Sequence, residues 1–459
     1  MNKRQKITII LMGALLCSVS TANELTKNLT LDTLTLDRAI QLAIDNDPWL
    51  KGVEYRQQAL ESRAIAAGQL PDPKLSLNIL NLPTDTFEFD QEPMTQLKVG
   101  VSQQFPRGKT RALKQQQLEQ RSEQTVYQRE DRKAMVTLTV TQLWLEWLRQ
   151  QKTIALIEKD RSLFEDLAEI VNANYASAFG KTQQHDIIQA QVELTRLEDR
   201  LYRLSEAADI HLAKLNEWLP TPIHTINHST LPRLTIRSSF PMKDTGLNET
   251  FINDTVINKI AAQHFLQHPK ILQLDQTIAT NTTAMQLAKQ QYKPQWGVNT
   301  SYAFRDDDAA GNDRADFFSV GVTLDLPLFT ANRQDKQVDA TIAETEASKT
   351  EKWQLLRSFV AKTNQAKAKL QRLEQRQQLY QTRLLKEIHE QVEASLTAYT
   401  NDNTDFNQVV RARITELNSR IDALSIDIDR LQAIAQLNYL FTQAEKTPAN
   451  TTATEGAKP

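Results

Sequence analysis

The chain contains two copies of one pattern, 221 residues apart, and this duplication limits its possible folds more than any other feature. Asp47-Pro48 in the first copy corresponds to His268-Pro269 in the second. The same offset relates four further landmarks: Pro73 and Pro294, Asn78 and Asn299, Val99-Gly100-Val101 and Val320-Gly321-Val322, and Pro106 and Pro327. Because all these landmarks share one register, they indicate an internal repeat, and each copy should form the same structural unit.

Each copy contains the same series of segments. A short helical region, at about 36–70 and again at about 254–291, precedes two strand-like segments and a very long helical tract. We therefore predict a first repeat over 23–218 and a second over 254–445. The segment 219–253 has the Pro-, Thr-, Ser- and Asn-rich composition of a connection, and the tail 446–459 has a composition typical of disorder.

Four segments alternate apolar and polar residues, which predicts β-strands with one apolar face. These strands are expected over 74–82, 96–105, 295–304 and 317–326. A strand of about ten residues is long enough to cross the hydrocarbon layer of a membrane when it is tilted. A small soluble sheet packed on helices is the alternative interpretation.

The helical tracts are longer than those of ordinary globular domains. No proline occurs between Gly108 and Ala178, and a helix of that length would extend for about 105 Å at 1.5 Å per residue. The return segments place residues that are almost all apolar at alternating steps of three and four, which predicts coiled-coil packing. These positions are Ile187, Ala190, Leu194, Leu197, Leu201, Leu204, Ala208, His211 and Leu215 in the first copy, and Ile414, Leu417, Ile421, Leu424, Ile428, Leu431 and Ala435 in the second.

Strand number limits how such a chain could lie in a membrane. Four strands cannot close a barrel, and open strand edges are not tolerated in lipid. If the strands are in a membrane, several copies of the chain must therefore combine them. The strand count alone is compatible with a dimer as well as a trimer.

The N-terminus resembles an export signal. Basic residues precede an uncharged, mostly apolar run over 7–19, and small residues end at Ala22, which predicts a signal peptide over 1–22. The only cysteine, Cys17, lies within it and follows Leu16, whereas a lipid-attachment motif requires a small residue there. Cleavage after Ala22 is therefore expected, and an uncleaved membrane anchor is the alternative.

Charge and residue types argue against several functional classes. The 54 basic and 56 acidic residues give no net basic field for nucleic acid. No arrangement of nucleophile, base and orienting residue is recognisable, so we expect neither an enzyme nor a cofactor. The seven histidines are scattered, and the closest pair, His224 and His228, has no evident third ligand, so no metal site is expected.

With these features, the sequence resembles the TolC-type outer-membrane efflux family, and the resemblance covers nearly the whole chain after the signal. The stretches that carry it are Leu70-Pro71-Asp72-Pro73, Glu92-Pro93-Met94, the run from Val99 to Pro106, and the region from Gly180 to Gln191 with Asp186 and Ala190. The Pro-Asp-Pro and Glu-Pro-Met stretches are most similar to the heavy-metal branch, which includes the cobalt-zinc-cadmium and copper-silver efflux channels.

The resemblance implies a mainly α protein with membrane β structure. It implies a homotrimer whose 12-strand β-barrel lies in the outer membrane of a Gram-negative bacterium, in contact with lipid, and continues as a 12-helix α-barrel through the periplasm. Such a protein is a passive duct. Its expected partners are a periplasmic adaptor (membrane fusion) protein and an inner-membrane RND-type pump, and its cargo could be heavy-metal cations. The alternatives are a soluble periplasmic coiled-coil adaptor or scaffold, and a secreted enzyme with added helices.

Three acidic residues are the candidates for a channel gate. Asp186, Asp402 and Asp405 lie near the two helix reversals, which the resemblance places at the periplasmic mouth. Symmetry would turn each into a ring of carboxylates, which favours cations. The alternative is that they are helix N-caps. The second reversal departs from the family, because Asp402 replaces a usual glycine and Asn407 a usual aspartate.

Overall fold

The computed structural model describes residues 34–176, 184–222, 230–236, 265–308, 310–401 and 403–444. The predicted signal peptide 1–22 with Cys17, the pair His224 and His228, Asp402, and the tail 446–459 lie outside the described residues. So does most of the predicted connection 219–253.

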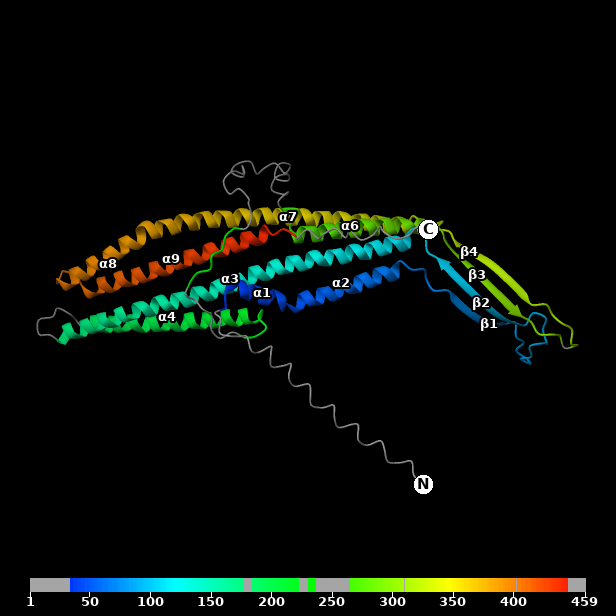
Figure 1. Ribbon diagram of the computed structural model, residues 1–459, viewed down its shortest axis with the longest axis horizontal. Helices are drawn as coiled ribbons and strands as arrows, with labels where there is room; N and C mark the ends of the chain where they lie inside the picture. Colours follow the sequence, from blue (N-terminus) through cyan, green and yellow to red (C-terminus); the bar gives the residue numbers. More distant parts are fainter. Residues whose placement is uncertain are drawn as a thin grey trace, which may run out of the picture. The chain divides into compact units, whose positions relative to one another are not determined.

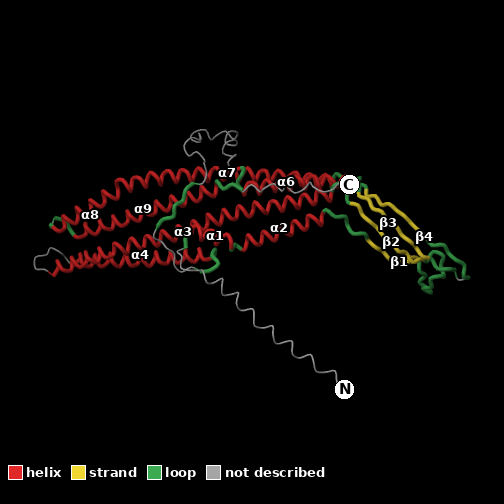
Figure 2. Tube along the Cα trace, viewed as in Figure 1, coloured by secondary structure: helices red, strands yellow, loops and turns green. Residues whose placement is uncertain are grey.

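Helices dominate the described residues, and the strands form one sheet (Figures 1 and 2). In chain order the first copy contains α1 (Leu36–Asp45), α2 (Pro48–Ala67), β1 (Lys74–Leu80), β2 (Gln96–Phe105), α3 (Thr110–Ala176) and α4 (Gln184–Asn216). The second contains α6 (Pro269–Lys289), a 3-10 turn (Gln290–Tyr292), β3 (Gln295–Phe304), β4 (Phe317–Asp325), α7 (Gln334–Leu379), a π-helical turn (Tyr380–Leu384), α8 (Leu385–Thr400) and α9 (Phe406–Leu440).

The first landmark of the repeat is a helix start in both copies. Pro48 and Pro269 occupy the first helical position, where a missing backbone N–H has no cost. The Asp47 carboxylate accepts a hydrogen bond from the Trp49 backbone N–H at 2.9 Å, and His268 Nδ1 accepts one from Lys270 at 3.1 Å. His268 therefore replaces an acidic N-cap with a neutral one, and its burial lowers its pKa.

Two of the strands end earlier than the alternation predicts. β1 stops at Leu80 because Asn81 has a positive φ of 55°, which turns the chain out of the strand. β4 stops at Asp325, one residue before the expected end at 326. Pro327 follows there, and proline has no N–H with which to extend a ladder.

The chain divides into two compact units, each of which draws on both repeats. One comprises residues 139–234 and 376–429 together with the N-terminal part through Asn46. The other comprises 47–138, 235–375 and the part from Arg430 onward, and it includes the sheet. Helices α3, α7 and α9 contribute to both, so the units do not follow the duplication.

The sheet has the antiparallel order β1-β2-β3-β4, and its register gives it one apolar face. Leu77 pairs with Val99, Val99 with Tyr302, and Tyr302 with Phe318, so all four side chains share a face. The neighbouring row consists of Ser76, Gly100, Ser301 and Ser319 on the opposite face. β1 and β4 are the two edges, and each has one unpaired side within the described sheet.

The apolar face of the sheet is exposed rather than covered by helices. Val320 is 62% exposed, and Leu75, Leu77, Ile79, Phe318 and Val322 are exposed to a similar degree or more. A continuous exposed apolar surface of this kind indicates contact with lipid or with another chain.

The helical unit that contains both helix reversals has an apolar core between its helices. Its buried or half-buried positions include the predicted steps of three and four in α4 and α9, such as Leu197, Leu201, Leu417 and Ile421. These side chains pack against Ile157, Phe164, Leu167 and Val171 of α3. The spacing therefore predicted correctly which faces of the return helices are buried.

Candidate functional site

The first helix reversal leads into α4. The buried candidate Asp186 lies at the start of this helix. The turn itself, residues 177–183, lies outside the described residues. Asp186 is in the first turn of α4 and only 8% exposed, with its Oδ1 3.2 Å from His185 Nε2. A carboxylate in the first turn of a helix interacts favourably with the helix dipole. The position of Asp186 is therefore compatible with stabilisation of the start of α4 as well as with a gate.

The second reversal joins α8 to α9, and its candidate Asp405 is exposed. Asp405 directly precedes α9, and its backbone carbonyl accepts a hydrogen bond from Gln408 at 3.0 Å. The turn is closed by a hydrogen bond of 2.9 Å from the Asn403 N–H to the Ala398 carbonyl and by edge-to-face packing of Tyr399 on Phe406. Among the described residues of this turn, Asp405 is thus the acidic side chain available to an aqueous ion.

The structure brings the two reversals into one apolar core. Val171 and Ala190 flank the first reversal, and Phe406 and Val409 follow the second, and all four belong to the same buried cluster. The helix ends next to Asp186 and Asp405 therefore contribute apolar side chains to one buried cluster within a single chain.

A cluster of buried charges lies on the same helices, and none of its residues was among the candidates predicted from the sequence. Glu416 of α9 is 4% exposed and accepts hydrogen bonds from His389 Nδ1 at 3.0 Å, Arg420 at 2.6 Å and Arg413 at 3.2 Å. Arg420 also reaches the buried Asp160 of α3 at 3.3 Å. The cluster thereby connects α3, α8 and α9.

The two carboxylates of the cluster have opposite pKa shifts. Burial raises the pKa of Asp160, and the nearby Arg420 offsets this effect only in part. Burial also acts to raise the pKa of Glu416, but the hydrogen bond from His389 and the charges of Arg420 and Arg413 outweigh it and lower the pKa. Glu416 is therefore the firmly ionised centre of the cluster.

One sequence signal could have revealed this cluster. In α3, the steps of three and four run through Ile157, Asp160, Phe164, Leu167 and Val171. An acidic residue at such a position faces the core and requires a cationic partner. The arginines of α9 supply that partner.

Metal binding is not indicated by the geometry of the described part of the chain. There, no three His, Cys, Asp or Glu side chains lie close enough together to hold a metal ion.

No helix in the described ranges has the length and apolar character that a bilayer crossing requires.

No protein-family model matches the sequence, and no curated protein sequence matches it significantly. Solved structures do match. A membrane protein from Pseudomonas aeruginosa has a TM-score of 0.73 and 12% identity, with 89% of this chain and 90% of that chain covered. The outer membrane protein VceC from Vibrio cholerae has a TM-score of 0.70 and 13% identity, covering 89% of this chain and 97% of that chain. The open MtrE outer membrane channel of Neisseria gonorrhoeae has a TM-score of 0.69 and 13% identity, with 88% of each chain covered.

The chain has the fold of outer-membrane channel proteins. The expected resemblance to the TolC-type family is thus confirmed at the level of the fold. Six similar structures are between 11% and 13% identical to the chain, so their similarity does not favour the heavy-metal branch over another.

We predict that Glu416→Gln destabilises this helical unit by about 3 kcal/mol, because it removes the buried anion that Arg413 and Arg420 share. Asp160→Asn should cost about 1 kcal/mol or less, since burial already favours the neutral form at that position. Chemical denaturation of the purified protein, followed by hydrogen exchange in α9, measures both effects.

The pH dependence provides the control for this prediction. Because the pKa of Glu416 is lowered, its contribution to stability is complete above its ordinary pKa and disappears as the pH falls through the lowered value. The difference between the wild-type protein and the Glu416→Gln variant should therefore shrink in acid. Equal stabilities at neutral pH, or a difference that grows in acid, would contradict the role of the cluster.

Proposed function

We propose that the chain is one protomer of the outer-membrane channel of a tripartite efflux system, a passive duct for export out of the cell. The observation that carries this proposal is the sheet, which has an exposed apolar face, a polar opposite face and two open edges. The fold shared with outer-membrane channel proteins over most of the chain supports it.

The polar face of the sheet suits an aqueous lumen. It carries Ser76, Asn78, Gly100, Ser301 and Ser319, which are small or uncharged and leave room for solute. The apolar face suits the acyl chains of the membrane. A soluble periplasmic adaptor or scaffold, the alternative function, would expose this same apolar face to water at a large cost in free energy.

Closure of the barrel requires other copies of the chain. In the proposed homotrimer, β4 of each protomer pairs with β1 of the next and the three chains contribute 12 strands and 12 helical segments. The TolC-type resemblance supports the number three, and the open edges support the mode of pairing. The protein would then lie in the outer membrane of a Gram-negative bacterium and extend into the periplasm, after removal of the signal peptide 1–22.

The proposed partners are a periplasmic adaptor (membrane fusion) protein and an inner-membrane RND-type pump, as the same resemblance implies. Heavy-metal cations are the proposed cargo on the basis of the Pro71-Asp72-Pro73 and Glu92-Pro93-Met94 stretches. We further propose that Asp402 and Asp405, with Asp186 behind them, form the cation-selective constriction at the periplasmic mouth. The exposure of Asp405 supports this role, while the burial of Asp186 favours an indirect contribution from that residue.

The two faces of the sheet should respond differently to charge. Val320→Arg would place a cation in lipid, which costs about 2–4 kcal/mol near the middle of the bilayer, whereas Ser319→Arg would face the lumen. We expect the first variant to accumulate poorly in outer membranes washed with carbonate, and the second to reach wild-type levels. Similar membrane levels of both variants would contradict the assignment of the faces.

The gate is tested by ion selectivity. Asp405→Asn combined with Asp402→Asn should lower the preference for cations over anions in planar bilayers, and the effect should be largest at low salt, where charges are least screened. Asp186→Asn should act in the same direction but more weakly. If the acids are only helix caps, asparagine replaces them at a cost of about 1 kcal/mol or less and selectivity is unchanged at every salt concentration.

A further inference from the structure

The polar face of the sheet carries more positive than negative charge. Within the strands, the charged side chains on this face are Lys74, Lys98 and Asp325. The carboxylate of Asp325 forms a salt bridge with Arg107, which follows β2. Within the described residues, neither lysine forms a salt bridge with a carboxylate. The charges of Lys74 and Lys98 are therefore not neutralised by the sheet itself.

A third cation reaches the row of side chains that contains Lys98. In this row Lys98 pairs with Ala303, and Ala303 pairs with Phe317. Arg305 directly follows β3, and its guanidinium carbon lies 4.7 Å from the centre of the Phe317 ring. The hydrogen bonds of this guanidinium group, of 2.8 and 3.4 Å, go to two backbone carbonyls, which have no formal charge. Lys98 and Arg305 therefore place two positive charges at the same end of the polar face.

The carboxylates around these cations are distant or engaged elsewhere. Asp325 is four rows from Lys98, which corresponds to about 27 Å at two residues per row. This distance exceeds the Debye length at physiological ionic strength, about 8 Å. Asp316 is closer, but it accepts a hydrogen bond of 2.9 Å from the Arg305 backbone N–H and another from the hydroxyl of Tyr302 on the apolar face. No carboxylate of the polar face therefore offsets the field of Lys98.

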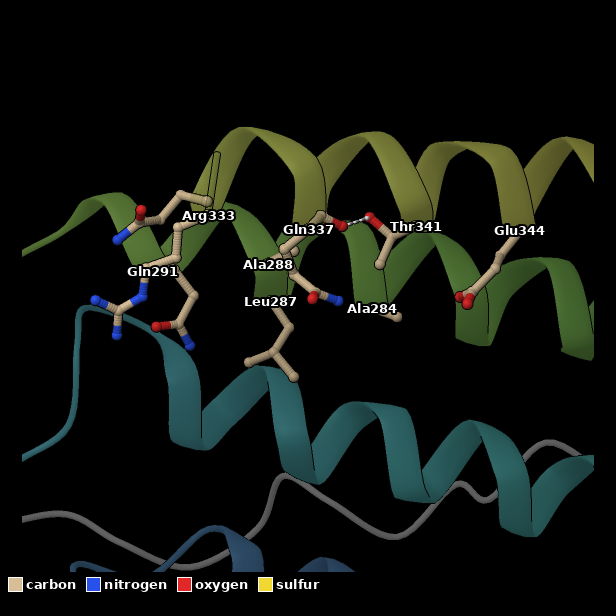
Figure 3. A pocket seen from close by; sticks show the side chains of 9 residues that line it. Ala284, Leu287, Ala288, Gln291, Arg333, Gln337, Thr341 and Glu344 are labelled. Carbon is tan, nitrogen blue, oxygen red and sulfur yellow. Dashed lines mark hydrogen bonds between the residues drawn. The ribbon is translucent and has the colours of Figure 1, made fainter. Parts of the chain in front are cut away.

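The segments around the sheet contribute charges of negative or of both signs. Figure 3 shows a cavity between α6 and α7, with Arg333 at one end and Glu344 at the other. The connection after Arg305 begins with three acidic residues, Asp306 to Asp308. The positive excess therefore belongs to the polar face of the sheet rather than to its surroundings.

In the proposed barrel this face lines the lumen, and each copy of the chain contributes the same cations. Lys98 and Arg305 would then form rings at one end of the barrel, and Lys74 would form a ring two rows away, at about 14 Å. The row between them consists of serine and glycine and leaves room for solute. A lumen with walls of low dielectric constant concentrates the field of such charges, and rings of lysine or arginine favour anions.

We propose that Lys98 and Arg305, together with Lys74, make the barrel section of the duct selective for anions. The solutes that this section favours are organic compounds with a carboxylate or phosphate group. The inference rests on the proposed function, which places the polar face in the lumen, and it deepens that function by naming a class of cargo. Free heavy-metal cations would meet a repulsive field in this section, whereas the acids proposed for the periplasmic mouth act on another part of the duct.

A cysteine next to Lys98 measures the local field directly. Ser301 lies on the polar face one row from Lys98, and the only native cysteine, Cys17, is in the predicted signal peptide. Intact cells with the Ser301→Cys protein are treated at low ionic strength with a negatively or a positively charged methanethiosulfonate of similar size. We expect Lys98→Gln to lower the ratio of the anionic to the cationic reaction rate about fivefold, and Lys98→Glu to lower it further. Arg305→Gln should act in the same direction.

Two substitutions serve as matched controls. Lys98→Arg retains the charge, and Lys362→Gln removes the charge of an exposed lysine in α7, outside the sheet, so both should keep the ratio of the Ser301→Cys protein. A ratio that neither Lys98→Gln nor Lys98→Glu changes would overturn the inference. A Ser301→Cys protein that reaches the outer membrane but reacts with neither reagent would instead contradict the lumenal position of the polar face, so failure of the proposed function is distinguishable.

Discussion

Unpaired backbone groups at the edges of a four-stranded sheet govern the rest of this structure. The outer sides of β1 and β4 present N–H and C=O groups that require partners, and the adjoining apolar face requires a surface other than water. In lipid, where no water can satisfy an open edge, only a closed arrangement is stable. The barrel that we propose, completed by several copies, would explain the exposed apolar face and the open edges of this sheet together.

The duplication doubles the number of strands that each chain contributes to such a closed arrangement. Each chain contributes two similar hairpins, and both copies lead from a proline-started helix into a strand. At the start of this helix, the N-cap is the carboxylate of Asp47 in the first copy and the neutral imidazole of His268 in the second. The second is buried and contacts the carbonyl of Tyr439, so a neutral cap avoids the cost of a buried charge.

Periodicity in the sequence predicted the elements well because burial imposes it directly. Strand alternation and the steps of three and four at positions such as Leu417 and Ile421 reflect which side chains face a neighbour. The relation between strands has no such signal. Asn78 pairs with Lys98, whereas its counterpart Asn299 pairs with Gly321, so the two hairpins differ by two residues in register. A shift of two keeps every side chain on its face, and therefore leaves no trace in the alternation.

The candidate site was predicted less completely for a related reason. A carboxylate near a helix turn has the same sequence pattern whether it is buried, like Asp186, or exposed, like Asp405. The environment of Glu416 depends on residues from three helices, far apart in sequence, so its partners could be identified only from the fold.

Disulfide cross-linking between sheet edges tests the central claim most directly. Within the chain, Ser102 of β2 pairs with Asn299 of β3. The 221-residue offset of the repeat relates Ser102 to Thr323 of β4, and Asn299 to Asn78 of β1. If β4 of one copy pairs with β1 of the next in the same register, Thr323 and Asn78 are therefore partners. Within one chain these edges are about 14 Å apart, too far for a disulfide, so any bond must join two copies.

We would combine Thr323→Cys with Asn78→Cys, and with Ser76→Cys and Leu80→Cys to allow for a register shift of two. Leu77→Cys, on the opposite face, is the control. Closure by pairing of β4 with β1 predicts covalent multimers on a non-reducing gel for at least one same-face pair and none for the control. Monomers for all three same-face pairs, in protein that has reached the outer membrane, would contradict it.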